Sequence, residues 1–174
     1  MSKIFLGYLF VFFHIKLNGF DILADCVGFF FIWQGLCAYD VPRFSQAKPW
    51  ALGLGLVSLL SIFGGFSLTF GRMFPLVNLT VTLASVYLLW LIVQGVGELA
   101  TGRTLPLPAQ QLGTVWKVQA GAAIAAAVLR LIVVPLPTAA WLMLLAGLVA
   151  LAANVLFLIH IYKTKKLLDE AEML

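Results

Sequence analysis

Charged residues are scarce in this sequence. Lysine, arginine, aspartate and glutamate together make up 10% of the 174 residues, whereas 63% are hydrophobic. A soluble domain is about one quarter charged, because most of its surface faces water. So few charges would leave the surface of a soluble domain bare, and we therefore expect the outer surface of this protein to face lipid.

Residues that commonly carry out chemistry are also few. The chain has two histidines, His14 and His160, and two cysteines, Cys26 and Cys37. The cysteines are about 16 Å apart along one predicted helix, which is too far for a disulfide. The motifs HExxH, CxxC and GxSxG and the phosphate-binding P-loop do not occur. We therefore predict no catalytic residue, no metal site and no cofactor, and an enzyme is the least favoured function class.

The apolar residues form six long runs. A bilayer core of about 30 Å needs about 20 apolar residues in a helix, whereas barrel strands alternate apolar with polar residues. The predicted fold is therefore an all-α, polytopic transmembrane bundle of six helices, in a single domain of residues 1–174. The predicted spans are residues 4–17, 20–39, 49–70, 75–100, 113–134 and 138–162. The first run is short, so five spanning helices plus a re-entrant or interfacial first segment is the alternative.

The distribution of basic residues predicts the orientation. Lysine and arginine are enriched in cytoplasmic loops of membrane proteins. With the N-terminus inside, eight of them lie on the cytoplasmic side and only Lys16 and Arg72 lie outside. Both termini are therefore predicted to be cytoplasmic. The net charge of +4 comes from basic residues scattered at the ends of the runs, so we expect no nucleic-acid partner.

Small residues predict where two helices pack. In lipid, close approach of helix backbones through glycine and alanine drives association. Gly121 and Ala125 have this spacing in the fifth run, and Ala146 and Ala150 have it in the sixth, where Asn154 continues the same face. We predict a tight hairpin contact through these faces, and a homodimer seam is the alternative.

Several polar residues lie at an inner depth of the predicted bundle. Gln34 and Gln94 are at matching depth and could share an amide hydrogen bond, and Gln119 lies in the same layer. Glu98 and Lys117, near the inner ends of neighbouring helices, are candidates for an ion pair. The alternative is that Glu98 carries a proton or a cation, because intramembrane charges often have functional roles.

A second polar layer lies in the outer half. It contains His14, Asp21, Asp25 and Arg130. Arg130 lies about 7 Å from Pro135 along its helix, at a depth similar to that of Asp25. A guanidinium pairs well with a carboxylate, so we predict that Arg130 binds Asp25 or is shared between Asp25 and Asp21. Whether this cluster fastens helices together or forms the mouth of a solute or ion site stays open.

The stretch KIFLGYLFVFFHIKLNGFDILADCVGFFFIWQGL resembles the opening of a group of uncharacterised small multi-pass membrane proteins from Gram-positive bacteria. The resemblance covers about fifty residues. Asp21, Leu23, Asp25 and Gly28 match that group's pattern, whereas Ala24 stands where the group has proline. The resemblance implies a bacterial membrane protein and brings no established activity.

These observations predict a small multi-pass protein of the bacterial cytoplasmic membrane, in contact with membrane lipids. Its leading function class is transport-related: a small carrier, a channel subunit or the membrane component of a transporter. The alternative is a non-catalytic accessory, immunity or scaffold protein that binds a partner membrane protein, or a second copy of itself, through its Gly/Ala faces. A cavity that opens on Asp21, Asp25 and Arg130 would favour transport.

Overall fold

Six helices make up the computed structural model of this chain, which describes residues 1–12, 22–62, 74–103, 107–131 and 137–172. The helices are α1 (Ser2–Phe12), α2 (Ile22–Cys37), α3 (Pro42–Ile62), α5 (Phe74–Arg103), α6 (Ala109–Leu131) and α7 (Pro137–Glu172). No strand occurs within the described ranges. The predicted all-α class is therefore confirmed.

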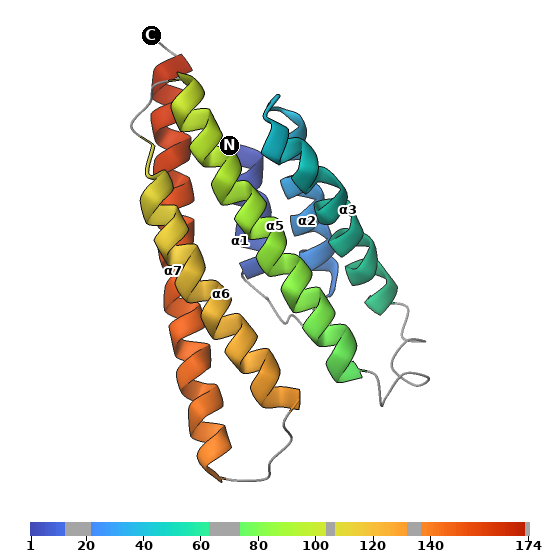
Figure 1. Ribbon diagram of the computed structural model, residues 1–174. Coiled ribbons are helices and arrows are strands. Elements are labelled where there is room, and N and C mark those ends of the chain that lie inside the picture. The colour runs from blue at the N-terminus through green and yellow to red at the C-terminus, as the bar shows by residue number, and fades with distance from the viewer. Residues whose placement is uncertain (13–21, 63–73, 104–106, 132–136, 173–174) are drawn as a thin grey trace.

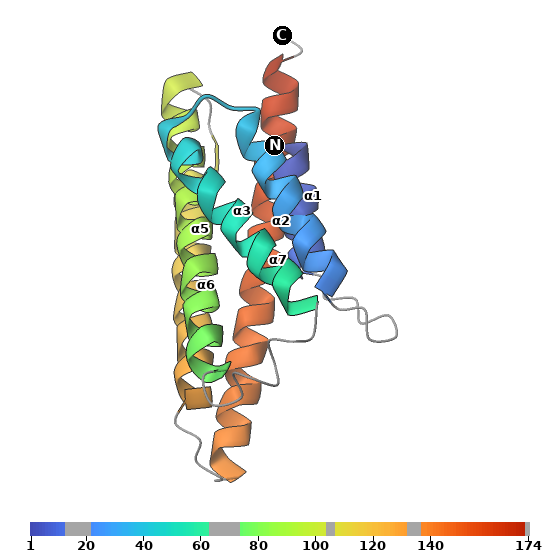
Figure 2. The same ribbon diagram turned by 90° about the vertical axis from the view of Figure 1, so that its right-hand side faces the viewer.

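The helices are arranged as a closed ring. Each one packs on its neighbours in the chain, and α7 packs on α1 to complete the circle. Successive helices run in opposite directions, so both ends of the chain lie toward the same end of the bundle (Figures 1 and 2). Because α1 is only 11 residues long and α7 is 36, the α6–α7 hairpin extends well beyond α1.

Side chains from all six helices meet in the middle of the ring. Leu36, Phe44, Leu91, Leu112 and Phe157 come from five different helices, and each is 0% exposed. Ile4 adds α1 to the same cluster. The interior at this level is thus filled by close-packed apolar side chains.

The helix bounds differ from the apolar runs at two places. The backbone carbonyl of Val41 accepts a hydrogen bond from the N–H of Ser45 (3.0 Å), so α3 begins at Pro42 rather than after a polar loop. Proline suits the first helical position because its fixed φ is helical and its missing N–H would have no partner there. At the other end of the chain, α7 continues past the predicted sixth span to Glu172.

Helices α1 and α2 approach each other closely at their glycines. A Cβ on Gly28 would lie 2.7 Å from the carbonyl oxygen of Gly7, and one on Gly35 would lie 2.8 Å from the backbone nitrogen of Ile4. Real Cβ atoms do not come this close to backbone atoms, so α1 and α2 can touch only because these positions are glycine.

The tight contact expected through Gly121 and Ala125 is not found. Both residues are exposed, and a Cβ on Gly121 would meet nothing within 4 Å. The buried small residues of α6 are instead Ala120, Ala122 and Ala127. Ala146 and Ala150 on α7 are half-buried. Helices α6 and α7 do pack together, but α6 is rotated so that Gly121 and Ala125 face outward.

Within the described residues, two helical segments are long and apolar enough to cross a membrane. They are Leu79–Gly102 in α5 and Leu144–Ala171 in α7. Ser2–Phe12 and Asp25–Cys37 are apolar but shorter. The length and composition of these two helices are thus consistent with membrane association.

Substituting Gly28 with alanine tests the α1–α2 contact. The added methyl group would meet backbone atoms of α1, and these can move only if the whole helix shifts. We therefore expect Gly28→Ala to lower the free energy of unfolding by about 1–3 kcal/mol. The matched control is Gly53→Ala in α3, where a Cβ meets nothing within 4 Å. The control should be neutral or stabilising by up to about 1 kcal/mol, because alanine favours helix. Equal thermal stability of the two variants in detergent micelles would contradict the contact.

Candidate functional site

The predicted outer charge cluster lies largely outside the described residues. His14 and Asp21 belong to a range that the structure does not describe, and only the backbone of Arg130 is described, within α6. Asp25 lies half-buried in the first turn of α2. The predicted pair between Asp25 and Arg130 involves the Arg130 side chain, which lies outside the described part of the structure. That pair stays a prediction.

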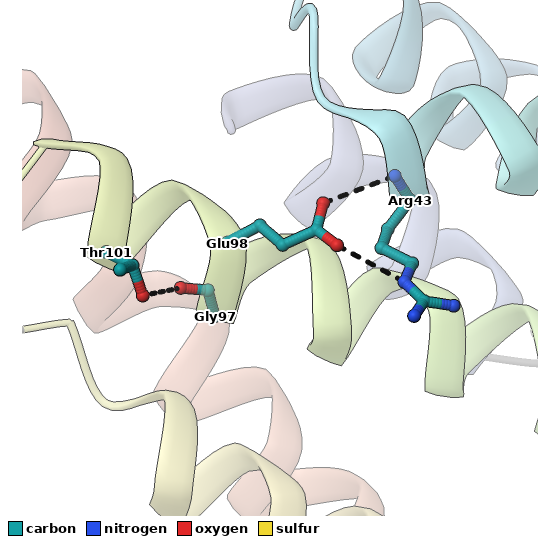
Figure 3. A network of polar contacts seen from close by, with 4 residues as sticks. All are labelled: Arg43, Gly97, Glu98 and Thr101. Atoms are coloured by element: carbon teal, nitrogen blue, oxygen red, sulfur yellow. Dashed lines mark hydrogen bonds and ion pairs between the residues drawn. The ribbon is translucent and has the colours of Figure 1, made fainter.

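Glu98 of α5 binds the beginning of α3 at two points. Its Oε1 accepts a hydrogen bond from Arg43 Nε (3.2 Å), and its Oε2 accepts one from the backbone N–H of Arg43 (3.4 Å; Figure 3). The first N–H groups of a helix have no acceptor within the helix, and a negative charge there is favoured by the helix dipole. Glu98 therefore caps α3 from a neighbouring helix and forms an ion pair with Arg43.

Two further contacts hold the beginning of α3 against α5. The guanidinium carbon of Arg43 lies 5.5 Å from the centre of the Trp90 ring, a cation–π distance. The next residue, Phe44, lies against Gly95, where a Cβ would collide with the phenyl ring. Arg43 and Glu98 remain 38% and 40% exposed, so this ion pair is accessible from outside the bundle.

The partner of Glu98 is thus Arg43 and not the expected Lys117. Lys117 is exposed on α6, on the same outward stripe as Gly121 and Ala125. The expectation failed because the third predicted span began at residue 49, whereas helix α3 starts at Pro42 and brings Arg43 to α5.

The two glutamines of the inner layer lie in different surroundings. Gln94 is exposed and lines the same open groove as Glu98, whereas Gln34 is half-buried in α2. Among the described side chains no hydrogen bond joins Gln34 to Gln94.

A second polar cluster is enclosed between α1, α6 and α7. Gln119 Nε2 donates to Tyr8 Oη (3.0 Å) and to Asn154 Oδ1 (2.6 Å), and the Tyr8 hydroxyl also donates to Asn154 Oδ1. Tyr8 is 4% exposed and Gln119 is 9% exposed. This polar triad of Tyr8, Gln119 and Asn154 is uncharged and joins three helices.

The backbone of α7 determines how the triad is oriented. Asn154 Nδ2 donates to the carbonyl oxygen of Ala150 (2.8 Å), so Asn154 must direct its oxygen at the other two residues. Gln119 must then present its amide nitrogen, because two facing oxygens would repel each other. Its own oxygen, Oε1, is left buried and accepts no hydrogen bond within the part of the chain that the structure describes. Leaving a buried acceptor unsatisfied costs about 1–3 kcal/mol.

Sequence reasoning noticed Gln119 and Asn154 but not Tyr8. The phenol of Tyr8 is the one polar group in the apolar run of α1 between Lys3 and Phe12. A buried tyrosine hydroxyl normally needs a hydrogen-bond partner. The need of a buried tyrosine hydroxyl for a partner could have marked Tyr8 as a candidate. It could not identify the partners, which lie more than 100 residues away in the chain.

Comparison with known proteins gives no assignment for this arrangement. No protein-family model matches the chain, and no curated protein or solved structure is significantly similar to it.

A double-mutant cycle tests which cation pairs with Glu98. We expect Glu98→Gln and Arg43→Gln to show a coupling energy of about 0.5–1 kcal/mol in thermal unfolding, because half-exposed ion pairs contribute in this range. The matched cycle of Glu98→Gln with Lys117→Gln should be additive. Coupling to Lys117 and none to Arg43 would contradict the structure.

Proposed function

We propose that this chain is an integral protein of the bacterial cytoplasmic membrane, crossed by all six helices, with both termini cytoplasmic. The observation that carries this proposal is that large apolar side chains are exposed on every helix. One example from each is Phe10, Phe30, Leu56, Leu83, Val118 and Leu145. A soluble protein rarely exposes large apolar side chains on every helix, whereas a lipid-facing surface requires them.

The dimensions of α7 support this location. Trp141 (73% exposed) and Tyr162 (51% exposed) are about 31 Å apart along the helix at 1.5 Å per residue, close to the thickness of a bilayer core. Aromatic residues favour both membrane boundaries, and Lys163 follows directly. Only 17% of the apolar window in α7 is buried, which differs from the buried core helix of a soluble protein.

The charged residues support the orientation. Lys3 and Arg43 lie in the first turns of α1 and α3, and Lys48 lies in the second turn of α3. Lys163 and Lys166 lie near the end of α7. These helix ends lie toward the end of the bundle that carries both termini (Figure 1). Because basic residues favour the cytoplasmic side, this end is proposed to face the cytoplasm.

Single cysteines at the two ends of α7 test this orientation. With Cys26 and Cys37 replaced by serine, we expect Trp141→Cys to react with a membrane-impermeant maleimide in intact spheroplasts. Lys166→Cys should react only after lysis, because it would lie on the inner side. Labelling of Lys166→Cys in intact cells would contradict the proposed orientation, and equal labelling of both before lysis would contradict a spanning α7.

For its activity we propose the transport-related class: a small carrier, a channel subunit or the membrane component of a transporter. The polar triad carries this proposal. Asn154 lies about 12 Å from Tyr162 along α7, well inside the proposed span. Polar groups at such depth are costly in lipid and usually face the bundle interior or a water-filled cavity. The free acceptor Gln119 Oε1 is one position where a passing solute or water could donate a hydrogen bond.

The accessory class is the second candidate, and one observation favours it. Gly121 and Ala125 face outward with open space beside Gly121, so the small-residue stripe predicted to join α6 to α7 remains available to another helix. Such stripes let helix backbones approach closely in lipid. A partner membrane protein or a second copy of the chain could pack there.

Accessibility of position 119 to water separates the two classes. In the cysteine-free background, we expect Gln119→Cys to react with a small water-soluble methanethiosulfonate reagent in sealed vesicles, because the reactive thiolate forms only where water reaches. The control is Val118→Cys, one residue away but 50% exposed on the outer surface of the bundle, where lipid would suppress the reaction. If position 119 reacts no faster than position 118, the transport proposal fails and the accessory class is favoured.

A further inference from the structure

One face of α5 carries two open grooves, one after the other. Their α5 lining residues recur every three or four positions from Leu83 to Thr101, which places them on one side of the helix over about 27 Å. The first groove, of about 260 Å³, is lined by Leu83, Val86, Tyr87, Trp90 and Trp116. The second, of about 630 Å³, is lined by Gln94, Gly97, Glu98, Thr101 and Gly102. The face therefore changes from apolar and aromatic to polar along its length.

Neighbouring helices form the sides of this face. Helix α5 packs on α3 and on α6 and lies between them. Trp50 of α3 contacts Tyr87 edge-on, with ring centres 5.0 Å apart. On the other side, Trp116 of α6 is held by a hydrogen bond from its Nε1 to the carbonyl oxygen of Val86 (3.0 Å). The two grooves thus form a valley along α5, flanked by α3 and α6.

The aromatic groove fits a hydrocarbon chain. Tyr87 and Trp90 stack with ring centres 5.6 Å apart, and the indole N–H of Trp116 is already bound to the backbone. The groove consequently presents rigid ring surfaces and few free polar groups. Its α5 residues, from Trp90 to Leu83, lie about 12–22 Å from Glu98 along the helix, a range that includes the thickness of one leaflet of a bilayer core, about 15 Å.

The polar groove is lined by the carboxylate of Glu98, and the oppositely charged Arg43 of α3 lies beside it. The hydrogen bonds of Arg43 to Glu98 use its backbone N–H and Nε, while its guanidinium carbon lies over the Trp90 ring. The two Nη groups of Arg43 therefore remain available to bind an anion, and the half-exposed carboxylate of Glu98 can accept a further donor. A purely anionic headgroup would be repelled by Glu98, and a purely cationic one by Arg43.

We propose that this valley binds one phospholipid with a zwitterionic headgroup from the cytoplasmic leaflet. The lipid phosphate contacts the Nη groups of Arg43, its ammonium contacts Glu98, and one acyl chain lies along Tyr87, Trp90 and Trp116. This site rests on the proposed membrane location and does not depend on the transport proposal.

Quenching of tryptophan fluorescence by brominated lipid tests the site. A groove reporter carries Trp33→Phe, Trp50→Phe and Trp141→Phe and keeps Trp90 and Trp116. A control reporter keeps only Trp141, which is 73% exposed on α7. Both are reconstituted in vesicles of equal parts phosphatidylethanolamine and phosphatidylglycerol, with bromines on the chains of one lipid or of the other.

From the quenching of tryptophan fluorescence in the groove reporter, we expect a relative affinity about two- to fivefold higher for phosphatidylethanolamine than for phosphatidylglycerol. This ratio corresponds to the contribution of half-exposed ion pairs. The control reporter should show no preference. Adding Glu98→Gln to the groove reporter should reverse the preference toward phosphatidylglycerol, because the site then carries a net positive charge.

Three results would overturn the proposal or its premise. Equal quenching by the two lipids in the groove reporter, or a preference for phosphatidylglycerol, would disprove the zwitterionic site while leaving the membrane location intact. Absence of quenching in both reporters would instead disprove the membrane location. If Glu98→Gln does not fold, as judged by circular dichroism, the comparison of the two lipids in the groove reporter alone decides the proposal.

Discussion

The hydrogen bond from Asn154 to the carbonyl oxygen of Ala150 has consequences far beyond α7. It directs the Asn154 oxygen toward Tyr8 and Gln119, and Gln119 can meet that oxygen only if its face of α6 points inward. Burying polar groups without partners is expensive, and the rotation of α6 places Gln119 where it meets this oxygen. The opposite stripe, with Gly121 and Ala125, is then necessarily on the outside.

Different kinds of contact join the helices on the two sides of the ring. On the α1–α2 side, glycine allows backbone contact, with Gly28 against Gly7. On the α3–α5 side, the carboxylate of Glu98 caps a helix and binds Arg43 at an accessible position. Apolar burial adds little in lipid, where the surroundings are equally apolar, so such specific contacts would determine which helices pair. They also generate the two proposed sites, one inside the bundle at Gln119 and one on its surface beside Glu98.

Part of the candidate site could be predicted from the sequence. Glu98, Gln94 and Gln119 stand out because polar residues interrupt apolar helices. Their partners could not be predicted. Glu98 lies 55 residues from Arg43 in the chain, and Gln119 lies 111 residues from Tyr8. Distance in sequence does not indicate which helix faces align, so the choice of Lys117 as a partner rested on depth alone.

The sequence by itself determined that the chain forms helices, because long apolar runs rich in leucine and alanine, separated by proline and glycine, satisfy their backbone groups locally. Only the tertiary structure decided how each helix is rotated about its axis. That rotation depends on contacts that no local pattern encodes: a glycine that admits a neighbouring backbone, and an amide whose orientation is set by a carbonyl one turn away. For this reason the spacing of Gly121 and Ala125 could be recognised in the sequence, while the side of α6 that these residues occupy could not.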